Sequence, residues 1–135
     1  MKLIVGCLVL ALSVCCNTQR VRIKYTIEND LVDEKFSYSL DMYVNSREKF
    51  LTVMHKASAK DAHFHFNGTQ YPQLGFFVES INGLAGDFTQ ETFWALLIRY
   101  DDGGPDCLSH LGVSSLRVNR YDHVVYRYST YDIFN

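Results

Sequence analysis

The most reactive side chains in the body of this 135-residue sequence are Cys107 and five histidines. A cysteine and a histidine make a thiol–imidazole nucleophile when a helix start or a nearby cation activates the thiol. The sequence places neither feature at Cys107, and it contains no Gly-x-Ser-x-Gly motif and no glycine-rich phosphate loop. The residue types therefore argue against an enzyme.

Two of the histidines have a spacing that suits metal binding. His63 and His65 lie two residues apart in the alternating segment 63–66, so on a strand they would share one face. Cys107 or His110 would have to complete the ligand set. Neither stands at an informative spacing, so we expect a strand with a polar histidine face rather than a metal site.

Aromatic side chains gather in two short segments, Phe76-Phe77 and Phe93-Trp94. Successive residues of a strand point to opposite faces, so the two members of a pair cannot both enter one core. We expect core packing for Phe77 or Phe93. Trp94 is the sole tryptophan, and a large aromatic on a second face would form an apolar wall, the common lining of a ligand site.

Hydrophobic periodicity predicts a hairpin, then a helix, then several strands. The strands are expected at residues 21–27 and 36–44, which form the hairpin, and at 63–66, 76–81, 93–100, 116–118 and 124–128. The run 93–100 is almost continuously apolar, so we expect it at the centre of the sheet. Asn82-Gly83 predicts a tight turn.

The single expected helix follows the hairpin. Asn45 is predicted to cap it, with Glu48 reaching back in a capping box, and the helix should end near residues 59–61. Its buried stripe is expected to be Phe50, Val53, Met54 and Ala57. One helix on a mostly antiparallel sheet, or on two small sheets, satisfies this order and predicts an α+β, β-rich fold.

Residues 1–16 have the pattern of a secretory signal peptide. Lys2 precedes an apolar run over residues 3–14 and small residues follow. The run is shorter than the roughly 20 residues that span a bilayer. Cleavage after Cys16 or after Ser13 is expected to release one exported, extracellular domain, residues 17–135, without a membrane span.

The cysteines and charges narrow the class of protein further. Cys7, Cys15 and Cys16 lie in or beside the signal, so no internal disulfide framework is expected. Cys107 is then a buried thiol, an intermolecular link, or a partner for a retained Cys15 or Cys16. Without Lys2 the chain has 12 basic and 15 acidic side chains, a net charge of −3 with no basic cluster, which argues against nucleic-acid binding.

The segment Asn67-Gly68-Thr69 is an acceptor sequon for N-glycosylation. It predicts a glycoprotein with Asn67 in a surface loop.

Several motifs in order resemble the C-terminal β domain of the transcobalamin and gastric intrinsic factor family of cobalamin carriers. They are "IKYTIEND", "FLTVMHKASAKDAHFHF", "LGFFVESINGLAG", "TFWALLI", "LGVSSLRV" and "HVVYRYS", and together they span about residues 21–130. The resemblance implies a domain that lies over one face of a corrin ring. It also implies the contact residues Gln73, Leu74, Gly75, Phe76, Phe77, Val78, Trp94, Ala95 and Leu96.

The family pattern includes a helical domain that we do not expect in this chain, and Leu74 stands where family members often have tryptophan. We therefore expect a secreted binding protein for cobalamin or a related corrinoid, with a separate helical domain or a receptor as a further partner. On this hypothesis Trp94→Ala and Phe76→Ala remove binding without unfolding. The alternative is an extracellular protein-interaction module, or a carrier of another amphipathic ligand, on the same fold. A cystatin-like inhibitor is disfavoured because its Gln-x-Val-x-Gly loop and paired cysteines are missing.

Overall fold

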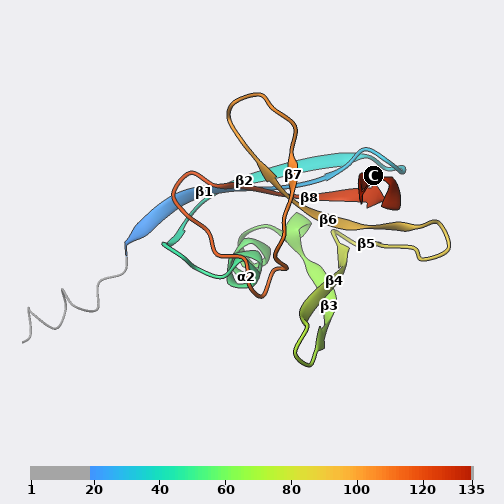
Figure 1. Cartoon of the computed structure of the whole chain (residues 1–135), viewed down its shortest axis with the longest axis horizontal. Coiled ribbons are helices and arrows are strands. Elements are labelled where there is room, and N and C mark those ends of the chain that lie inside the picture. The colour runs from blue at the N-terminus through green and yellow to red at the C-terminus, as the bar shows by residue number, and fades with distance from the viewer. Residues whose placement is uncertain (1–18, 135) are drawn as a thin grey trace, which may run out of the picture.

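The computed structural model describes residues 19–134 and has two sheets with one α-helix in that range (Figure 1). The elements are β1 (Arg20–Asn29), β2 (Phe36–Asn45), α2 (Phe50–Lys60), η1 (Ala62–Phe64), β3 (Phe66–Tyr71), β4 (Gly75–Ile81), β5 (Leu84–Ala85), β6 (Thr92–Arg99), β7 (Cys107–Leu108), β8 (His123–Thr130) and η2 (Tyr131–Phe134). The predicted α+β, β-rich class is confirmed. The proposed signal peptide lies outside the described residues. Within residues 19–134 no helix is long and apolar enough to cross a membrane.

The larger sheet has the strand order β2-β1-β8-β6-β7. All its pairs are antiparallel except β1 with β8, which run parallel from the pair Lys24 and His123 to the pair Glu28 and Arg127. The central strand is β8, not the segment 93–100. Strand β6 lies beside it and has a second neighbour only at the two short β7 pairs, so most of its outer edge is free of the larger sheet.

The predicted hairpin is confirmed as β1 and β2, which pair along their whole length. Asn29 closes it: its buried side chain donates to the carbonyls of Val32 and Glu34 and accepts from the amides of Leu31 and Val32. Four hydrogen bonds from one amide therefore fix the β1–β2 loop, because a buried polar group is costly to leave unpaired.

The core lies between one face of the larger sheet and helix α2, which crosses that face in Figure 1. Alternation along β1 buries Val21, Ile23, Tyr25 and Ile27, and the predicted helix stripe of Phe50, Val53, Met54 and Ala57 is fully buried. The Tyr25 ring meets the rings of Phe50 and Phe64, each with a centroid distance of 5.0 Å.

Helix α2 begins at Phe50, so the predicted cap at Asn45 is wrong. Residues 46–49 form a turn in which Arg47 has a φ of 65°. Glu48 does accept the Asn45 amide, at 3.2 Å, but it closes that turn instead of capping the helix. Long-range bonds hold the helix start: the Phe50 amide donates to Leu116 O at 2.8 Å.

Two further predicted strands differ in the structure. Residues 62–64 form the short helix η1 because the Asp61 side chain accepts the His63 amide and caps it, so only Phe66 of the segment 63–66 enters a strand. Residues 116–118 form no strand; the segment makes one isolated bridge, between Lys49 and Arg117.

The smaller sheet has the order β3-β4-β5 and projects from the helix side of the molecule (Figure 1). Its β4–β5 turn is the predicted Asn82-Gly83, with φ values of 52° and 77°, as expected for a two-residue hairpin turn. A bulge lies between Asn67 and Gly68, where a Cβ on Gly68 would come within 2.1 Å of Phe77 O. Asn67 is exposed, as the sequon requires, but it lies in a strand and not in a loop.

Candidate functional site

A groove of about 250 Å³ lies where the free edge of β6 faces β4. We call it the aromatic groove. Its lining comes from β4 (Phe76, Phe77, Val78), from β6 (Phe93, Trp94, Leu96), from residues 108–113, and from Tyr126 and Phe134. Five of the nine residues predicted to contact corrin therefore line one hollow, although they come from two strands of different sheets.

The segment 108–114 is tied to three elements, which fixes this side of the groove. The Ser109 amide donates to Leu96 O on β6 at 2.9 Å, and the Leu51 amide of α2 donates to Val113 O at 3.0 Å. The Phe76 amide of β4 donates to Ser114 Oγ at 2.9 Å. The groove is thus held by hydrogen bonds between parts of the chain far apart in sequence.

The two aromatics of β4 divide as the alternation predicts. Phe76 is half-buried and packs edge-on against Phe66, with a centroid distance of 5.9 Å. Phe77 is 52% exposed. Phe76 is therefore the ring that packs inward, and the expectation of core packing for Phe77 is wrong.

Three of the predicted contact residues lie at the turn of the β3–β4 hairpin instead of in the groove. Leu74 is 86% exposed, and Gln73 has a φ of 66°. Gly75 has a φ of 99°, and a Cβ there would also meet Ser114 Oγ at 3.1 Å. Only glycine adopts this backbone without strain, so Gly75 sets the direction in which Leu74 projects.

Trp94 is a core residue, not the exposed wall that the sequence suggests. It is 5% exposed, its ring packs against Tyr128 and Phe36, and its Nε1 donates to Leu84 O at 2.8 Å. Truncating a buried tryptophan costs about 3–5 kcal/mol. Trp94→Ala is therefore expected to destabilise the fold, so the prediction of binding loss without unfolding is wrong for this residue.

The side chains of the remaining β6 residues do not all lie on the groove side of the sheet. Leu96 lines the groove, whereas Ala95 is buried on the opposite face of the sheet, opposite Arg127 in the register with β8. Phe93 is half-buried and stacks on Phe134, with a centroid distance of 5.3 Å and an interplanar angle of 17°. Ala95 is thus not brought together with the other predicted contacts.

Sequence reasoning missed the segment 108–113 and Phe134. The segment has no periodicity, so its Leu111, which is 50% exposed, carries no signal of a site. Phe134 follows the last predicted strand and reaches the groove only because η2 turns back beside β6. Only tertiary structure brings these side chains together.

The other chemical candidates have different roles. The His63 ring stacks on Tyr38 at 3.9 Å and its Nδ1 lies 2.8 Å from Asp61 Oδ1. Hydrogen bonding from His63 lowers the pKa of Asp61. Within residues 19–134 no three potential ligand side chains gather around a metal position. Cys107 is exposed, so the buried-thiol interpretation is wrong.

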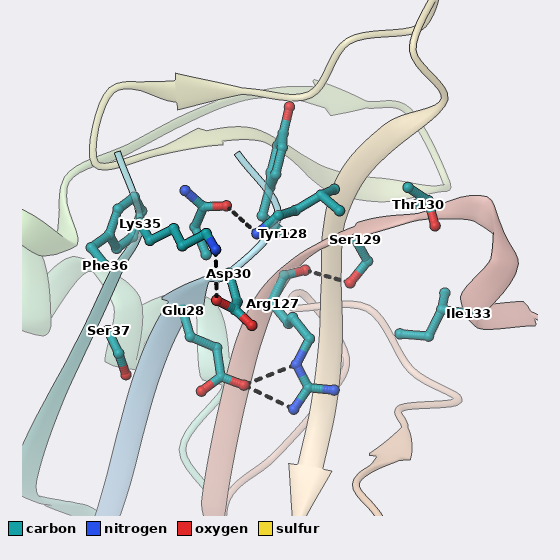
Figure 2. A pocket seen from close by; sticks show the side chains of 12 residues that line it. Glu28, Asp30, Lys35, Phe36, Ser37, Arg127, Tyr128, Ser129, Thr130 and Ile133 are labelled. Atoms are coloured by element: carbon teal, nitrogen blue, oxygen red, sulfur yellow. Dashed lines mark hydrogen bonds and ion pairs between the residues drawn. The ribbon is translucent and has the colours of Figure 1, made fainter. Parts of the chain in front are cut away.

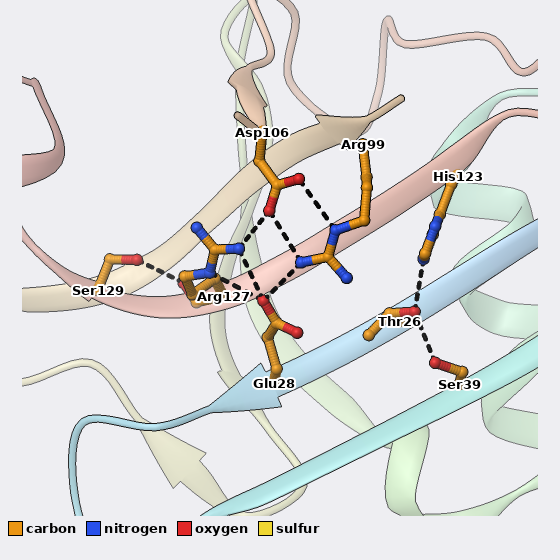
Figure 3. A network of polar contacts seen from close by, with 8 residues as sticks. All are labelled: Thr26, Glu28, Ser39, Arg99, Asp106, His123, Arg127 and Ser129. Carbon is orange, nitrogen blue, oxygen red and sulfur yellow. Dashed lines mark hydrogen bonds and ion pairs between the residues drawn. The ribbon is translucent and has the colours of Figure 1, made fainter. Parts of the chain in front are cut away.

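A polar network covers the face of the larger sheet that is opposite the helix (Figure 3). Asp106 accepts from both Arg99 and Arg127, and Glu28 bridges the same two guanidinium groups. Hydrogen bonds, first from Arg99 and then from Arg127, lower the pKa of Asp106. Nearby, burial and the positive charge of Arg99 lower the pKa of His123, whose Nε2 lies 2.7 Å from Thr26 Oγ1.

A second hollow, of about 860 Å³, lies between the β1–β2 loop and the end of β8 (Figure 2). Its charged side chains pair with one another: Glu28 with Arg127, and Asp30 with Lys35. Because these charges are mutually neutralised, the hollow selects for no ligand charge. The aromatic groove remains the better candidate site.

Within residues 19–134 the fold and the groove define a β-rich domain with one α-helix and an apolar groove, and comparison with known proteins finds sequence relatives and structures of similar fold. The chain is 31% identical over 83 residues to cobalamin binding intrinsic factor of Mus musculus, an alignment covering 60% of this chain and 20% of that protein. It is 28% identical over 113 residues to the Rattus norvegicus protein, covering 82% of this chain and 25% of that one. The chain thus spans a quarter or less of the length of these relatives. No protein-family model matches it.

Two solved structures share the fold. Haptocorrin in complex with Cbi superposes with a TM-score of 0.69 at 24% identity, over 85% of this chain and 26% of that chain. A putative metal binding protein from Ruminococcus gnavus superposes with a TM-score of 0.57 at 10% identity, over 82% and 97%. The predicted resemblance to the C-terminal β domain of the transcobalamin and gastric intrinsic factor family is confirmed.

Proposed function

We propose that this protein is an exported binding protein that holds cobalamin or a related corrinoid against the aromatic groove. The observation that carries the proposal is the coincidence of two independent lines. The family resemblance assigns ring contact to parts of β4 and β6, and the structure joins those parts in one apolar groove. The sequence relatives are cobalamin-binding proteins by name.

The residues of the groove suit a corrin ring. Corrin is broad, rather flat and fringed with amides, so it needs apolar area together with backbone donors and acceptors. Phe77 and Leu111 line the hollow, are at least half exposed and supply apolar area there. The edge of β6 next to the groove has little strand pairing of its own, which leaves main-chain groups beside the ligand.

The groove is open and covers only one side of a ligand of this size. The relatives are four to five times longer than the aligned part of this chain. We propose that a helical cobalamin-binding domain or a receptor covers the other face of the ring. The proposal is of a carrier and not of an enzyme.

The test is titration of the purified protein with cyanocobalamin and hydroxocobalamin, followed by Trp94 fluorescence and by calorimetry. Phe77→Ala should weaken binding about tenfold or more, because burying a phenylalanine is worth about 1.5–3 kcal/mol and 1.4 kcal/mol is tenfold in affinity. The matched control is Phe88→Ala, which removes an 86% exposed ring that does not line the groove. Equal loss in both variants, or no saturable binding by the unaltered protein, would contradict the proposal.

A further inference from the structure

Strand β2 forms one edge of the larger sheet, and within residues 19–134 no strand pairs with its outer side (Figure 1). The strand has ten residues and pairs with β1 in one unbroken register from Phe36 to Asn45. Natural sheet edges are commonly short, bulged or protected by lysine or proline, because an unpaired edge readily joins another strand. Strand β2 contains no lysine, no proline and no bulge. It is therefore an edge that stays open to a further strand.

The hydrogen bonds of the hairpin show which main-chain groups of β2 are free. The Ser46 amide donates to Gln19 O at 2.7 Å, and antiparallel partners exchange such bonds at every second residue. The even-numbered residues of β2 therefore bond to β1, and the odd-numbered residues point their amide and carbonyl groups outward. Between residues 37 and 43 the outward-pointing residues are Ser37, Ser39, Asp41 and Tyr43, which are all exposed. Tyr43 O accepts from Arg20 Nη2 at 2.8 Å, and a carbonyl oxygen has a second lone pair for another donor.

The order of these residues favours a second copy of β2, running antiparallel to the first. A two-fold axis through Leu40 places Ser39 opposite the partner's Asp41, and Ser37 opposite the partner's Tyr43. Each carboxylate then faces a hydroxyl group. An axis through Asp41 would place two carboxylates opposite each other, which is destabilising, and an axis through Ser39 would leave Tyr43 opposite a residue outside the strand. Only the axis through Leu40 pairs these outward-pointing residues without opposing like charges.

The same axis brings apolar side chains together on the face of the sheet that carries helix α2. Leu40 is half-buried at the open edge and would lie opposite the partner's Leu40, while Tyr38, also half-buried, would lie opposite the partner's Met42. The even-numbered residues form the non-hydrogen-bonded pairs of such a ladder, in which side chains approach most closely. The edge therefore offers main-chain hydrogen bonds together with apolar contact.

We propose that this protein self-associates through its β2 edges into a two-fold symmetric dimer with one continuous sheet. Affinity would come from main-chain hydrogen bonds, as in other cases of strand addition, and the pairing of Ser39 with the partner's Asp41 would set the register. Strands β1 and β8 separate β2 from β6 in the sheet, so the aromatic groove beside β6 stays open in each copy. The inference therefore stands independently of the proposed function.

The first experiment measures the mass of the purified protein by sedimentation equilibrium from about 1 μM to about 1 mM. It includes two variants at one exposed position, Ser39→Asp and Ser39→Lys, and circular dichroism checks that all three proteins are folded alike. We expect a concentration-dependent dimer. Ser39→Asp should raise the dissociation constant about tenfold, because it opposes two pairs of carboxylates, whereas Ser39→Lys faces the partner's Asp41 and should not raise it. A mass that stays monomeric throughout, or equal dissociation constants for the two variants, would overturn the proposal.

The second experiment tests the register by disulfide trapping in a Cys107→Ser background, which removes the exposed native thiol. Leu40→Cys should form an intermolecular disulfide on mild oxidation, because a non-hydrogen-bonded pair has Cα atoms about 4.5 Å apart and disulfides span about 4.4–6.8 Å. The matched control is Asp41→Cys, whose two copies lie diagonally across the axis and too far apart to bridge. Mass spectrometry of the linked peptides identifies the bond. Trapping of Asp41→Cys but not of Leu40→Cys, or equal trapping of both, would overturn the assigned register.

Discussion

Tyr25 and Tyr128 are two buried tyrosines of the core whose hydroxyl groups have different surroundings. The Tyr128 hydroxyl lies 2.8 Å from Thr92 Oγ1 and donates to Ala85 O at 2.8 Å. The Tyr25 hydroxyl has no hydrogen-bond partner among the described residues, and burial raises the pKa of Tyr25 well above its ordinary value. At the residue scale, we therefore expect these two buried tyrosine hydroxyl groups to contribute differently to the free energy of unfolding.

We expect Tyr25→Phe to leave the free energy of unfolding unchanged or to raise it, because the substitution removes a buried polar atom without a partner. Tyr128→Phe should lower it by about 1–2 kcal/mol, because Thr92 and Ala85 lose their partner. Urea unfolding of both variants beside the unaltered protein measures the difference. A Tyr25→Phe variant that loses as much as Tyr128→Phe would show that the Tyr25 hydroxyl is bonded in solution.

At the scale of elements, the contact between β4 and the segment 108–114 holds the candidate site together. Ser114 Oγ accepts the Phe76 amide, which is the first amide of β4 after Gly75. Ser114→Ala should lower stability by about 1 kcal/mol and speed hydrogen exchange at the Phe76 amide. Ser115→Ala is the matched control, because Ser115 is exposed and its side chain makes no such bond. Equal exchange in both variants would show that the turn end of the hairpin is held by packing alone.

The ion network places Asp106, at the end of the loop that follows β6, onto Arg127 of β8. Because its pKa is lowered in the folded state, its contribution to stability is present above the unfolded pKa of about 3.9 and is lost as the pH falls through the lower folded value. Asp106→Asn should therefore be less stable than the unaltered protein by about 1 kcal/mol at pH 7. The gap should hold down to about pH 5 and narrow below about pH 4.

Urea unfolding at pH 7, 5 and 3 measures that gap, with Asp102→Asn as the control in the same loop. Asp102 is exposed and accepts only the Gly104 amide. A gap for Asp106→Asn that stays constant down to pH 3 would mean that the charge of Asp106 contributes nothing and that only its shape matters.

The elements that the sequence predicts well are those whose signal is local. Alternation along 21–27 and 36–44 gives the β1–β2 hairpin, and Asn82-Gly83 gives the β4–β5 turn, because side-chain period and turn chemistry act within a few residues. The two-residue strands β5 and β7 have no period to detect. The helix start moves to Phe50 because residues 113–118 bond to residues 47–51 across the molecule.

The residues of the candidate site also divide into those that a local sequence signal predicts and those that only tertiary contacts place. Alternation predicts that Phe76 and Phe77 face apart, which the structure confirms. It cannot tell which member of Phe93-Trp94 faces the core. Phe36 of β2 and the carbonyl of Leu84 decide that Trp94 is buried, and both belong to other elements.

At the scale of the whole molecule, the exposed Asn67 connects the fold to the proposed export. Asn67 lies on β3 with its side chain exposed, and Thr69 completes the sequon. If the chain enters a secretory pathway, the modifying enzyme can reach Asn67, which is exposed near the start of β3. Analysis of a single expressed protein therefore tests both export and glycosylation.

Expression in a eukaryotic secretory host should yield a protein in the medium whose mass falls on treatment with a glycosidase. Thr69→Ala should abolish the glycan, because the sequon needs a hydroxyl residue there, while Thr69→Ser keeps both the hydroxyl and the glycan. N-terminal sequencing of the same product distinguishes cleavage after Cys16 from cleavage after Ser13. Cleavage after Ser13 retains Cys15 and Cys16, and a disulfide to the exposed Cys107 would then appear in the non-reduced mass. A product that stays in the cell with residues 1–16 attached would contradict export, and the carrier proposal would need another compartment.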